Sequence, residues 1–271
     1  MELPPAPSAG ATASTPEDFA ALLRGRGLYP QVPTTTGTHG SALLPTPTQA
    51  TTILAFKFAD GVLVAGDRRA TAGNVVVYER ADKVLEIDKY SLMAIAGVPA
   101  TAWEMARVLE HSFQFYRRSQ LQEMSLDGKV RALSKLLRDN LGFVMQGVGV
   151  VVPIFATHDL EADVSRLYFY DAMGAQFEVA DFAATGSGSP AVRSVLHYEN
   201  TWGPKPLAKR KEEDAVLLAL RALDTAAESD TATGGVDRRG RVYPIVKIIS
   251  RAGITTLPEK LLARLFKKHV A

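Results

Sequence analysis

Short apolar runs separated by turn residues dominate the chain from residue 51 onwards. Residues 52–58 and 62–66 are two such runs, and they flank Asp60 and Gly61. An Asp-Gly pair between apolar runs is a strong signal for a β-hairpin. Further strands are predicted by runs that end at Gly, Asp or Arg-Ala-Asp breaks, over residues 75–78, 83–87 and 91–96.

Helical spacing of apolar residues begins near residue 99. Residues 99–117 and 126–145 are predicted helices, and the broad apolar face of the second indicates packing against a core. Residues 148–155 are predicted to form a strand that is buried on both faces. The rest of the chain predicts strands over 166–170, 176–179, 242–249 and 254–256, and helices over 189–199, 207–229 and from Pro258 onwards.

This order of elements is strands, two helices, strands, two helices and strands. It predicts an α+β fold in which two sheets face each other and helices cover them, a four-layer αββα sandwich. The pattern alone fits an ordinary α+β fold equally well.

Residues 1–50 have a different composition from the rest of the chain. They hold eight of the fifteen prolines and are rich in Ala, Thr, Ser and Gly, so they cannot bury enough apolar surface to offset the entropy of ordering. Only residues 16–24 predict a short helix, with Pro16 at its start and Gly25 at its end. A flexible tail and a segment that is later removed are both compatible with this composition.

Composition and charge exclude several classes of function. A net charge of +2 provides no overall attraction to nucleic acid or to anionic lipid. The chain has no cysteine, so disulfides, thiol nucleophiles and zinc-ribbon sites are excluded. No apolar run is long enough for a membrane span, and the first residues lack the pattern of a secretion signal. We therefore expect a cytoplasmic protein whose nucleophile, if it has one, is an oxygen.

A threonine pair stands where residues 1–50 meet the first predicted strand, in the order Ala50, Thr51, Thr52, Ile53. If the chain is cut before Thr51, that residue supplies both a hydroxyl nucleophile and a free α-amine. An unperturbed α-amine has a pKa of about 7.7–8, which suits a base near neutral pH. Taken alone the pair is weak evidence, because threonine is a common strand residue.

Five further motifs follow Thr51 in a specific order. They are Gly66-Asp67-Arg68-Arg69-Ala70-Thr71, Asp82-Lys83, Ala94-Ile95-Ala96-Gly97, Gly186-Ser187-Gly188-Ser189 and Ser229-Asp230-Thr231-Ala232-Thr233-Gly234-Gly235. In this order and spacing, the chain from Thr51 to about Ser250 resembles proteasome β subunits of the actinobacterial type, which are N-terminal-nucleophile hydrolases. The resemblance implies an αββα fold, a propeptide over residues 1–50, a catalytic domain over 51–271 and threonine endopeptidase activity.

The resemblance also assigns roles to individual residues. Thr51 is the implied nucleophile, with Lys83 adjusting or carrying the proton of its hydroxyl and Asp67 holding Lys83. The backbone N–H of Gly97 is the implied oxyanion donor. The terminal amine and its surroundings are implied to depend on Ser187, Asp230 and Thr233. Without the resemblance, Asp67 would be an ordinary turn residue, Lys83 a solvated side chain and residues 229–235 a loop that ends a helix.

Substrate preference is implied by the positions that line the first specificity pocket in this family. They map onto six apolar residues with Thr71 beside them, namely Ala70, Ala81, Leu85, Ile95, Pro99 and Trp103. We expect chymotrypsin-like cleavage after a hydrophobic side chain. No cofactor or metal is expected, because the histidines lack paired spacing and residues 186–189 lack the lysine of a phosphate loop.

One departure from the family pattern concerns the residue before the nucleophile. It is usually glycine in processed β subunits and is Ala50 here, whose Cβ restricts the tight turn that cleavage between Ala50 and Thr51 requires. A ring-forming subunit that never frees Thr51 is therefore one alternative. The simpler two-ring bacterial threonine protease is another, although it lacks the long leader and the stretch over residues 229–235.

The resemblance implies partners that the chain itself does not reveal. These are proteasome α subunits and further β subunits in a 28-subunit α7β7β7α7 particle. For the actinobacterial type, a ring ATPase that feeds tagged, pupylated protein substrates is also implied.

Overall fold

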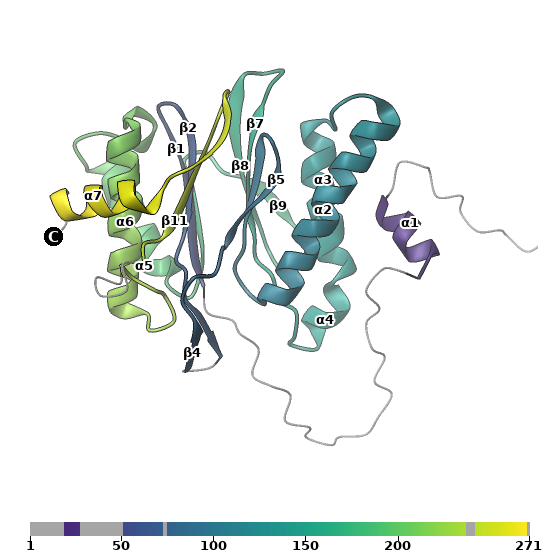
Figure 1. Ribbon diagram of the computed structural model, residues 1–271, viewed down its shortest axis with the longest axis horizontal. Coiled ribbons are helices and arrows are strands. Elements are labelled where there is room, and N and C mark those ends of the chain that lie inside the picture. The colour runs from purple at the N-terminus through teal and green to yellow at the C-terminus, as the bar shows by residue number, and fades with distance from the viewer. Residues whose placement is uncertain (1–18, 28–50, 73–74, 237–241, 270–271) are drawn as a thin grey trace, which may run out of the picture.

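The computed structural model describes residues 19–27, 51–72, 75–236 and 242–269. Two five-stranded antiparallel sheets lie face to face within these ranges (Figure 1). The first sheet has the order β10-β1-β2-β11-β12, with bounds Phe182–Gly186, Thr52–Phe58, Gly61–Gly66, Ile245–Ser250 and Gly253–Thr256. The second has the order β5-β6-β7-β8-β9, with bounds Val84–Asp88, Ser91–Ala94, Ile154–Asp159, Val164–Tyr170 and Gln176–Glu178. A small ribbon pairs β3 (Ala70–Ala72) with β4 (Val75–Tyr78).

Helices cover the outer face of each sheet (Figure 1). The first sheet is covered by α5 (Ser189–Thr201), α6 (Glu212–Ser229) and α7 (Glu259–His269), and the second by α2 (Pro99–Gln120), α3 (Leu126–Asp139) and α4 (Leu141–Met145). The predicted four-layer αββα sandwich is therefore confirmed. Outside these layers, α1 (Phe19–Gly25) lies against α2, where the Phe19 ring contacts His111 and Phe115. Residues 16–18 of the predicted leader helix lie outside the described residues.

Three apolar clusters hold the layers together. Alternation along β1 sends Leu54 and Phe56 toward α5 and α6, and Ile53 and Ala55 toward the facing sheet. The cluster between the sheets therefore consists of small and branched residues such as Val62, Val64, Leu92 and Ile154. A third cluster lies between the second sheet and helices α2 and α3. Because both sheets are covered on both faces, β1 is buried along nearly its whole length.

Several element boundaries differ from the prediction. The predicted helix 126–145 divides at Asn140, whose side-chain amide donates to the carbonyl of Gly149 at 2.7 Å. The predicted strand 148–155 begins only at Ile154, because Gly147 and Gly149 have positive φ, and Val151 forms an isolated bridge with Gly97.

Three further differences concern short elements. The predicted helix 207–229 is a 3-10 turn over Leu207–Lys209 followed by α6, and the strand predicted from residue 242 begins at Ile245. Strand β10 was not predicted at all, and it pairs with β1 from Thr52↔Gly186 to Phe56↔Phe182. This strand brings the Gly-Ser loop beside the start of β1. In the described part of the chain, no helix combines the length and the apolar character that crossing a membrane requires.

Candidate active site

Thr51 lies immediately before β1 and is 3% exposed. Its carbonyl accepts a hydrogen bond from the backbone N–H of Ser187 at 3.1 Å. Gly186, the residue before Ser187, has φ +99°, and a Cβ built on it would lie 1.8 Å from the Thr51 carbonyl oxygen. Only glycine permits this close approach, so β10 and the Gly-Ser loop determine where Thr51 lies.

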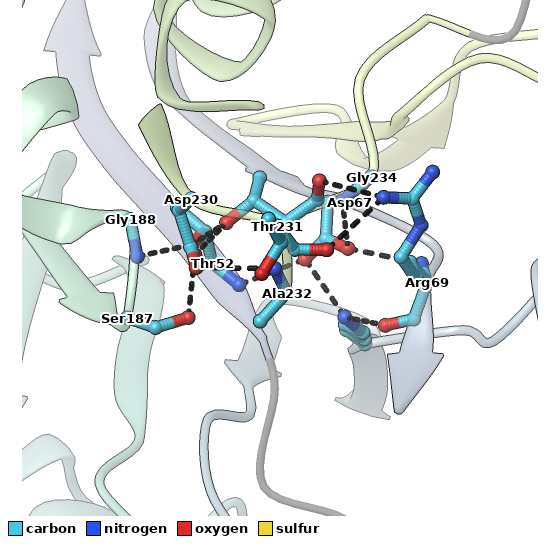
Figure 2. A network of polar contacts seen from close by, with 11 residues as sticks. Thr52, Asp67, Arg69, Ser187, Gly188, Asp230, Thr231, Ala232 and Gly234 are labelled. Carbon is cyan, nitrogen blue, oxygen red and sulfur yellow. Dashed lines mark hydrogen bonds and ion pairs between the residues drawn. The ribbon is translucent and has the colours of Figure 1, made fainter. Parts of the chain in front are cut away.

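Asp67 follows the end of β2, and its carboxylate is completely buried. Oδ1 accepts from the Thr52 N–H at 2.7 Å and from Lys83 Nζ at 2.7 Å. Oδ2 accepts from the Arg69 N–H at 2.9 Å and from the Gly234 N–H at 3.0 Å. Figure 2 shows this carboxylate between Thr52 and Arg69. The bond to Arg69 is the turn contact expected of an ordinary Asp, and the other three bonds connect it to distant segments.

Lys83 directly precedes β5 and is 4% exposed. Its ammonium donates to Asp67 Oδ1 and to the carbonyl of Arg69, the latter at 2.5 Å. Burial lowers the pKa of Lys83 below its ordinary value of 10.5, and the neighbouring Asp67 carboxylate offsets only part of that effect. A lysine with a lowered pKa can give up and take back a proton more readily than a solvated one.

A chain of hydroxyl groups lies on the other side of Thr52. Thr233 Oγ1 donates to Asp230 Oδ2 at 2.5 Å and lies 2.6 Å from Thr52 Oγ1. The Gly188 N–H donates to Thr52 Oγ1 at 2.9 Å. Because the Thr233 hydroxyl gives its proton to Asp230, the Thr52 hydroxyl must be the donor toward Thr233. The bonds therefore run in one direction, from Gly188 through Thr52 and Thr233 to Asp230.

Asp230 also accepts from Ser187 Oγ at 2.6 Å and from the Ala232 N–H at 3.1 Å. Burial by itself raises the pKa of this carboxyl, but the bonds from Ser187, Thr233 and Ala232, with the charge of Lys83, outweigh it. The net effect lowers the pKa of Asp230, which favours its charged form. The three residues expected around the terminal amine are thus connected to one another and to Thr52, the residue that follows Thr51.

Gly97 adopts φ +116°, and a Cβ on it would lie 2.0 Å from the Val150 carbonyl oxygen. Its neighbours hold it in place, since the Val98 N–H donates to the Val150 carbonyl at 2.8 Å and the Val152 N–H to the Ala96 carbonyl at 2.8 Å. The conformation at this position therefore requires glycine.

The expected specificity positions differ in burial. Ala70, Thr71, Ala81 and Ile95 are buried, whereas Leu85 and Pro99 are half-buried. Trp103 is 45% exposed on α2. Two of the residues are tied to the catalytic segments, since the Ile95 N–H donates to the Lys83 carbonyl at 2.9 Å and the Ala81 N–H to the Arg68 carbonyl at 3.0 Å.

Sequence reasoning assigned no role to several residues that build this site. Thr52 donates its N–H to the Asp67 carboxylate, and its hydroxyl connects through Thr233 to the Asp230 carboxylate. The Arg69 guanidinium donates to the carbonyl oxygens of Thr231 at 3.1 Å and Thr233 at 3.4 Å. It therefore joins the segment that carries Asp67 to the loop that follows α6. Glycines 188 and 234 supply backbone donors. Among the described residues, no group of three or more His, Asp or Glu side chains is arranged to hold a metal ion.

Comparison with known proteins agrees with this geometry. The model of the proteasome subunit family matches residues 48–239. The chain is 39% identical over 231 residues to proteasome subunit beta 2 of Thermomonospora curvata, covering 85% of this chain and 80% of that protein. It is 38% identical over 236 residues to the proteasome subunit beta of Acidimicrobium ferrooxidans, covering 87% and 82%. The same identity holds over 212 residues for the Streptomyces griseus proteasome subunit beta, covering 78% and 72%.

The family match spans the threonine pair, the carboxylates of Asp67 and Asp230, and Lys83, and the three relatives named above are all β subunits. The chain therefore belongs to the proteasome subunit family, as a β subunit with the threonine endopeptidase activity of the proteasome core.

Proposed function

We propose that Thr51 is the catalytic nucleophile of this subunit and that it becomes N-terminal when the bond between Ala50 and Thr51 is cut. One observation carries the proposal. The buried Asp67 carboxylate binds the Lys83 ammonium and the backbone N–H of Thr52 through the same oxygen, so the lysine is held next to the residue that follows Thr51. Residues 1–50 act as a propeptide and residues 51–271 as the catalytic domain. Ala50 lies outside the described residues.

Maturation uses the same hydroxyl as catalysis. Thr51 Oγ attacks the Ala50 carbonyl carbon, the peptide C–N bond breaks, and the acyl group passes from nitrogen to oxygen as an ester. Water then hydrolyses the ester, which leaves Ala50 as a carboxylate and Thr51 with a free amine. The Thr51 carbonyl is bound by the Ser187 N–H, which holds the attacking residue in place.

Substrate hydrolysis repeats this sequence on a bound peptide. The Thr51 hydroxyl gives its proton to its own α-amine, and its oxygen bonds to the scissile carbonyl carbon while the Lys83 ammonium stabilises the negative charge that develops on that oxygen. The backbone N–H of Gly97 stabilises the negative oxygen of the tetrahedral intermediate. The leaving amine takes up a proton, and water then hydrolyses the acyl-enzyme ester and restores Thr51. Ser187, Asp230 and Thr233 stabilise the terminal amine through the charge of Asp230.

The specificity positions support a chymotrypsin-like preference. Ala70, Ala81, Leu85, Ile95, Pro99 and Trp103 are apolar and lie close in sequence to Asp67, Lys83 and Gly97, with Thr71 next to Ala70. A panel of fluorogenic peptides should be cleaved faster after Leu, Phe or Tyr than after Arg or Glu. Faster cleavage after a charged residue would refute this preference.

The partners follow from membership of the proteasome core. Proteasome β subunits assemble with α subunits, and we assign this chain to the two inner rings of a 28-subunit α7β7β7α7 particle. A ring ATPase that delivers unfolded, pupylated proteins is the corresponding source of substrate. Co-purification with an α subunit, and degradation of a pupylated protein only when the ATPase is added, would test these assignments.

The deciding experiment measures the intact mass of this chain after co-assembly with its α partner, for the wild type and for Thr51→Ala and Thr51→Ser. We expect the wild type to lose residues 1–50 and to hydrolyse peptides. Thr51→Ala should assemble with its leader attached and hydrolyse nothing, whereas Thr51→Ser keeps a hydroxyl and should retain activity. An unshortened wild-type chain in complete particles would instead favour a ring-forming subunit that does not catalyse.

A further inference from the structure

Arg68 lies between the two residues that bind the Lys83 ammonium, Asp67 and Arg69. Its own contacts point to the segment that precedes Lys83. The Arg68 carbonyl accepts from the Ala81 N–H at 3.0 Å, and its Nη2 donates to the Arg80 carbonyl at 3.2 Å. The main chain and the side chain of Arg68 thus bind Ala81 and Arg80, which shortly precede Lys83 in the sequence.

The other arm of the guanidinium reaches the C-terminal helix. Arg68 Nη1 forms an ion pair with Oε1 of Glu259, the first residue of α7. Arg80 Nη1 lies 4.0 Å from the same oxygen. One carboxylate therefore lies between two guanidinium groups, one from the segment that carries Asp67 and one from the segment that carries Lys83. An Arg with both arms engaged is held in a single orientation.

Helix α7 is a firm support for this contact. Its apolar side chains Leu262, Leu265 and Phe266 are buried against the first sheet and α6, and the Phe266 ring meets Tyr243 edge to face. The helix therefore keeps its place through apolar packing, independently of the ion pair at its start. Glu259 also suits the first turn of a helix, where a negative charge is favourable.

We infer that Arg68 is a positioning residue for catalysis, and that Glu259 of α7 fixes through it the placement of Lys83 against Asp67. The inference rests on the proposed role of Lys83. Its physical basis is the sensitivity of catalysis to geometry, since a misplacement of about 1 Å can cost about 100-fold in rate. The C-terminal helix thus becomes part of the support of the active site.

The test compares Glu259→Gln with Glu213→Gln in assembled particles. Glu213→Gln is the control, and it removes another ion pair of α7, the one between Lys268 and Glu213 of α6 at 3.8 Å, at the other end of α7 from Glu259. Rates are counted per processed chain, using intact mass to measure the processed fraction. We expect Glu259→Gln to lower kcat about tenfold with KM nearly unchanged, and Glu213→Gln to match the wild type in kcat and in thermal midpoint.

Two Arg68 variants complete the test. Arg68→Ala should lower kcat at least as much as Glu259→Gln, and the double variant should be no slower than Arg68→Ala because both changes break one connection. Arg68→Lys keeps the charge but cannot bind Glu259 and the Arg80 carbonyl together, so its kcat should be intermediate.

Equal kcat in Glu259→Gln and Glu213→Gln, or additive effects in the double variant, would overturn the inference. If Arg68→Ala does not assemble, Glu259→Gln still decides, because the Glu259 side chain is 45% exposed and its loss leaves the core intact. Failure of the proposed function would look different, because Thr51→Ala would then remain active.

Discussion

Thr52 Oγ1 lies 2.6 Å from Thr233 Oγ1, although 181 positions separate the two residues. Both are completely buried, and the Thr233 hydroxyl already donates to Asp230. The start of β1 is therefore tied to the loop after α6 by a hydroxyl pair with only one consistent direction of donation. Thr52 is therefore held both by this bond and by the Asp67 carboxylate, and Thr51 lies one residue earlier.

Replacing Thr52 by Val should weaken the subunit. The change keeps the shape of the side chain but removes the hydroxyl that accepts from the Gly188 N–H and donates to the Thr233 hydroxyl oxygen. Leaving these buried groups without a partner costs about 1–3 kcal/mol for each. We expect a lower thermal midpoint and a fall in kcat of about tenfold, because the segment that carries Thr51 loses one of its anchors. Thr52→Ser retains the hydroxyl and serves as the control. Wild-type kcat in Thr52→Val would show that the hydroxyl chain does not position Thr51.

Replacing Gly186 by Ala should displace Thr51. The new Cβ would lie 1.8 Å from the Thr51 carbonyl oxygen, and the backbone stays at φ +99°. Gly147→Ala is a matched control, because Gly147 also has positive φ at +73° but a Cβ there meets nothing within 4 Å. The control should cost only the backbone strain of about 1–2 kcal/mol. Peptide hydrolysis should be lost in Gly186→Ala and kept in Gly147→Ala, and equal activities would contradict the prediction.

Asp230 should make the free energy of unfolding depend on pH in the acidic range. Its pKa in the folded state lies below the ordinary value of 3.8, so the unfolded chain takes up its proton first as the pH falls. The stabilisation that the charged Asp230 provides is fully present at pH values above 3.8, and it is lost as the pH falls through the folded-state pKa of Asp230.

Thermal midpoints of the wild type and of Asp230→Asn, measured between about pH 7 and about pH 3, test this expectation. The advantage of the wild type should be constant at neutral pH and shrink at the acid end. Ser187→Ala removes one of the bonds that lower the pKa and should give a smaller acid dependence than the wild type. A difference that does not change with pH would mean that the Asp230 charge is not stabilised by folding.

Replacing Ala50 by Gly should accelerate removal of the leader. Glycine reaches backbone conformations that a Cβ disfavours, so the Ala50 carbonyl can approach the Thr51 hydroxyl more easily. Intact mass at successive times after mixing with the α partner measures the rate. The processed enzyme is identical in both cases, so kcat per processed chain is an internal control. Equal rates of processing would show that the alanine is not an obstacle.

Much of this arrangement could be predicted because the order and spacing of its motifs resemble those of a known family, although each residue taken alone is ordinary for its place. Asp67 and Lys83 stand at strand ends at a fixed spacing from Thr51, and the stretch over residues 229–235 combines a carboxylate, hydroxyls and two glycines. The pattern of apolar residues predicted most of the strands and helices, because this pattern is local and the sequence displays it directly. The resemblance was needed to choose the αββα sandwich over an ordinary α+β fold.

The role of Thr52 and the presence of β10 depend on contacts between distant segments. Threonine is ordinary in a strand, and the available signal was a hydroxyl in a strand whose first five positions are all buried. Residues 182–186 contain two alanines and a glycine, which are poor strand formers, and they form a strand because they pair with the edge of β1. The break at Asn140 likewise depends on a carbonyl nine residues away.

The four donors around Asp67 also determine when the site can exist. They come from residues 52, 69, 83 and 234. The carboxylate therefore has all four hydrogen bonds only after both sheets and the segment beyond α6 have folded. A chain still emerging from the ribosome has made Thr51, Asp67 and Lys83 long before it has released Gly234. Thr51 is therefore not activated as a nucleophile during most of the chain's synthesis. Neither its leader nor neighbouring nascent chains are cleaved before the site has folded.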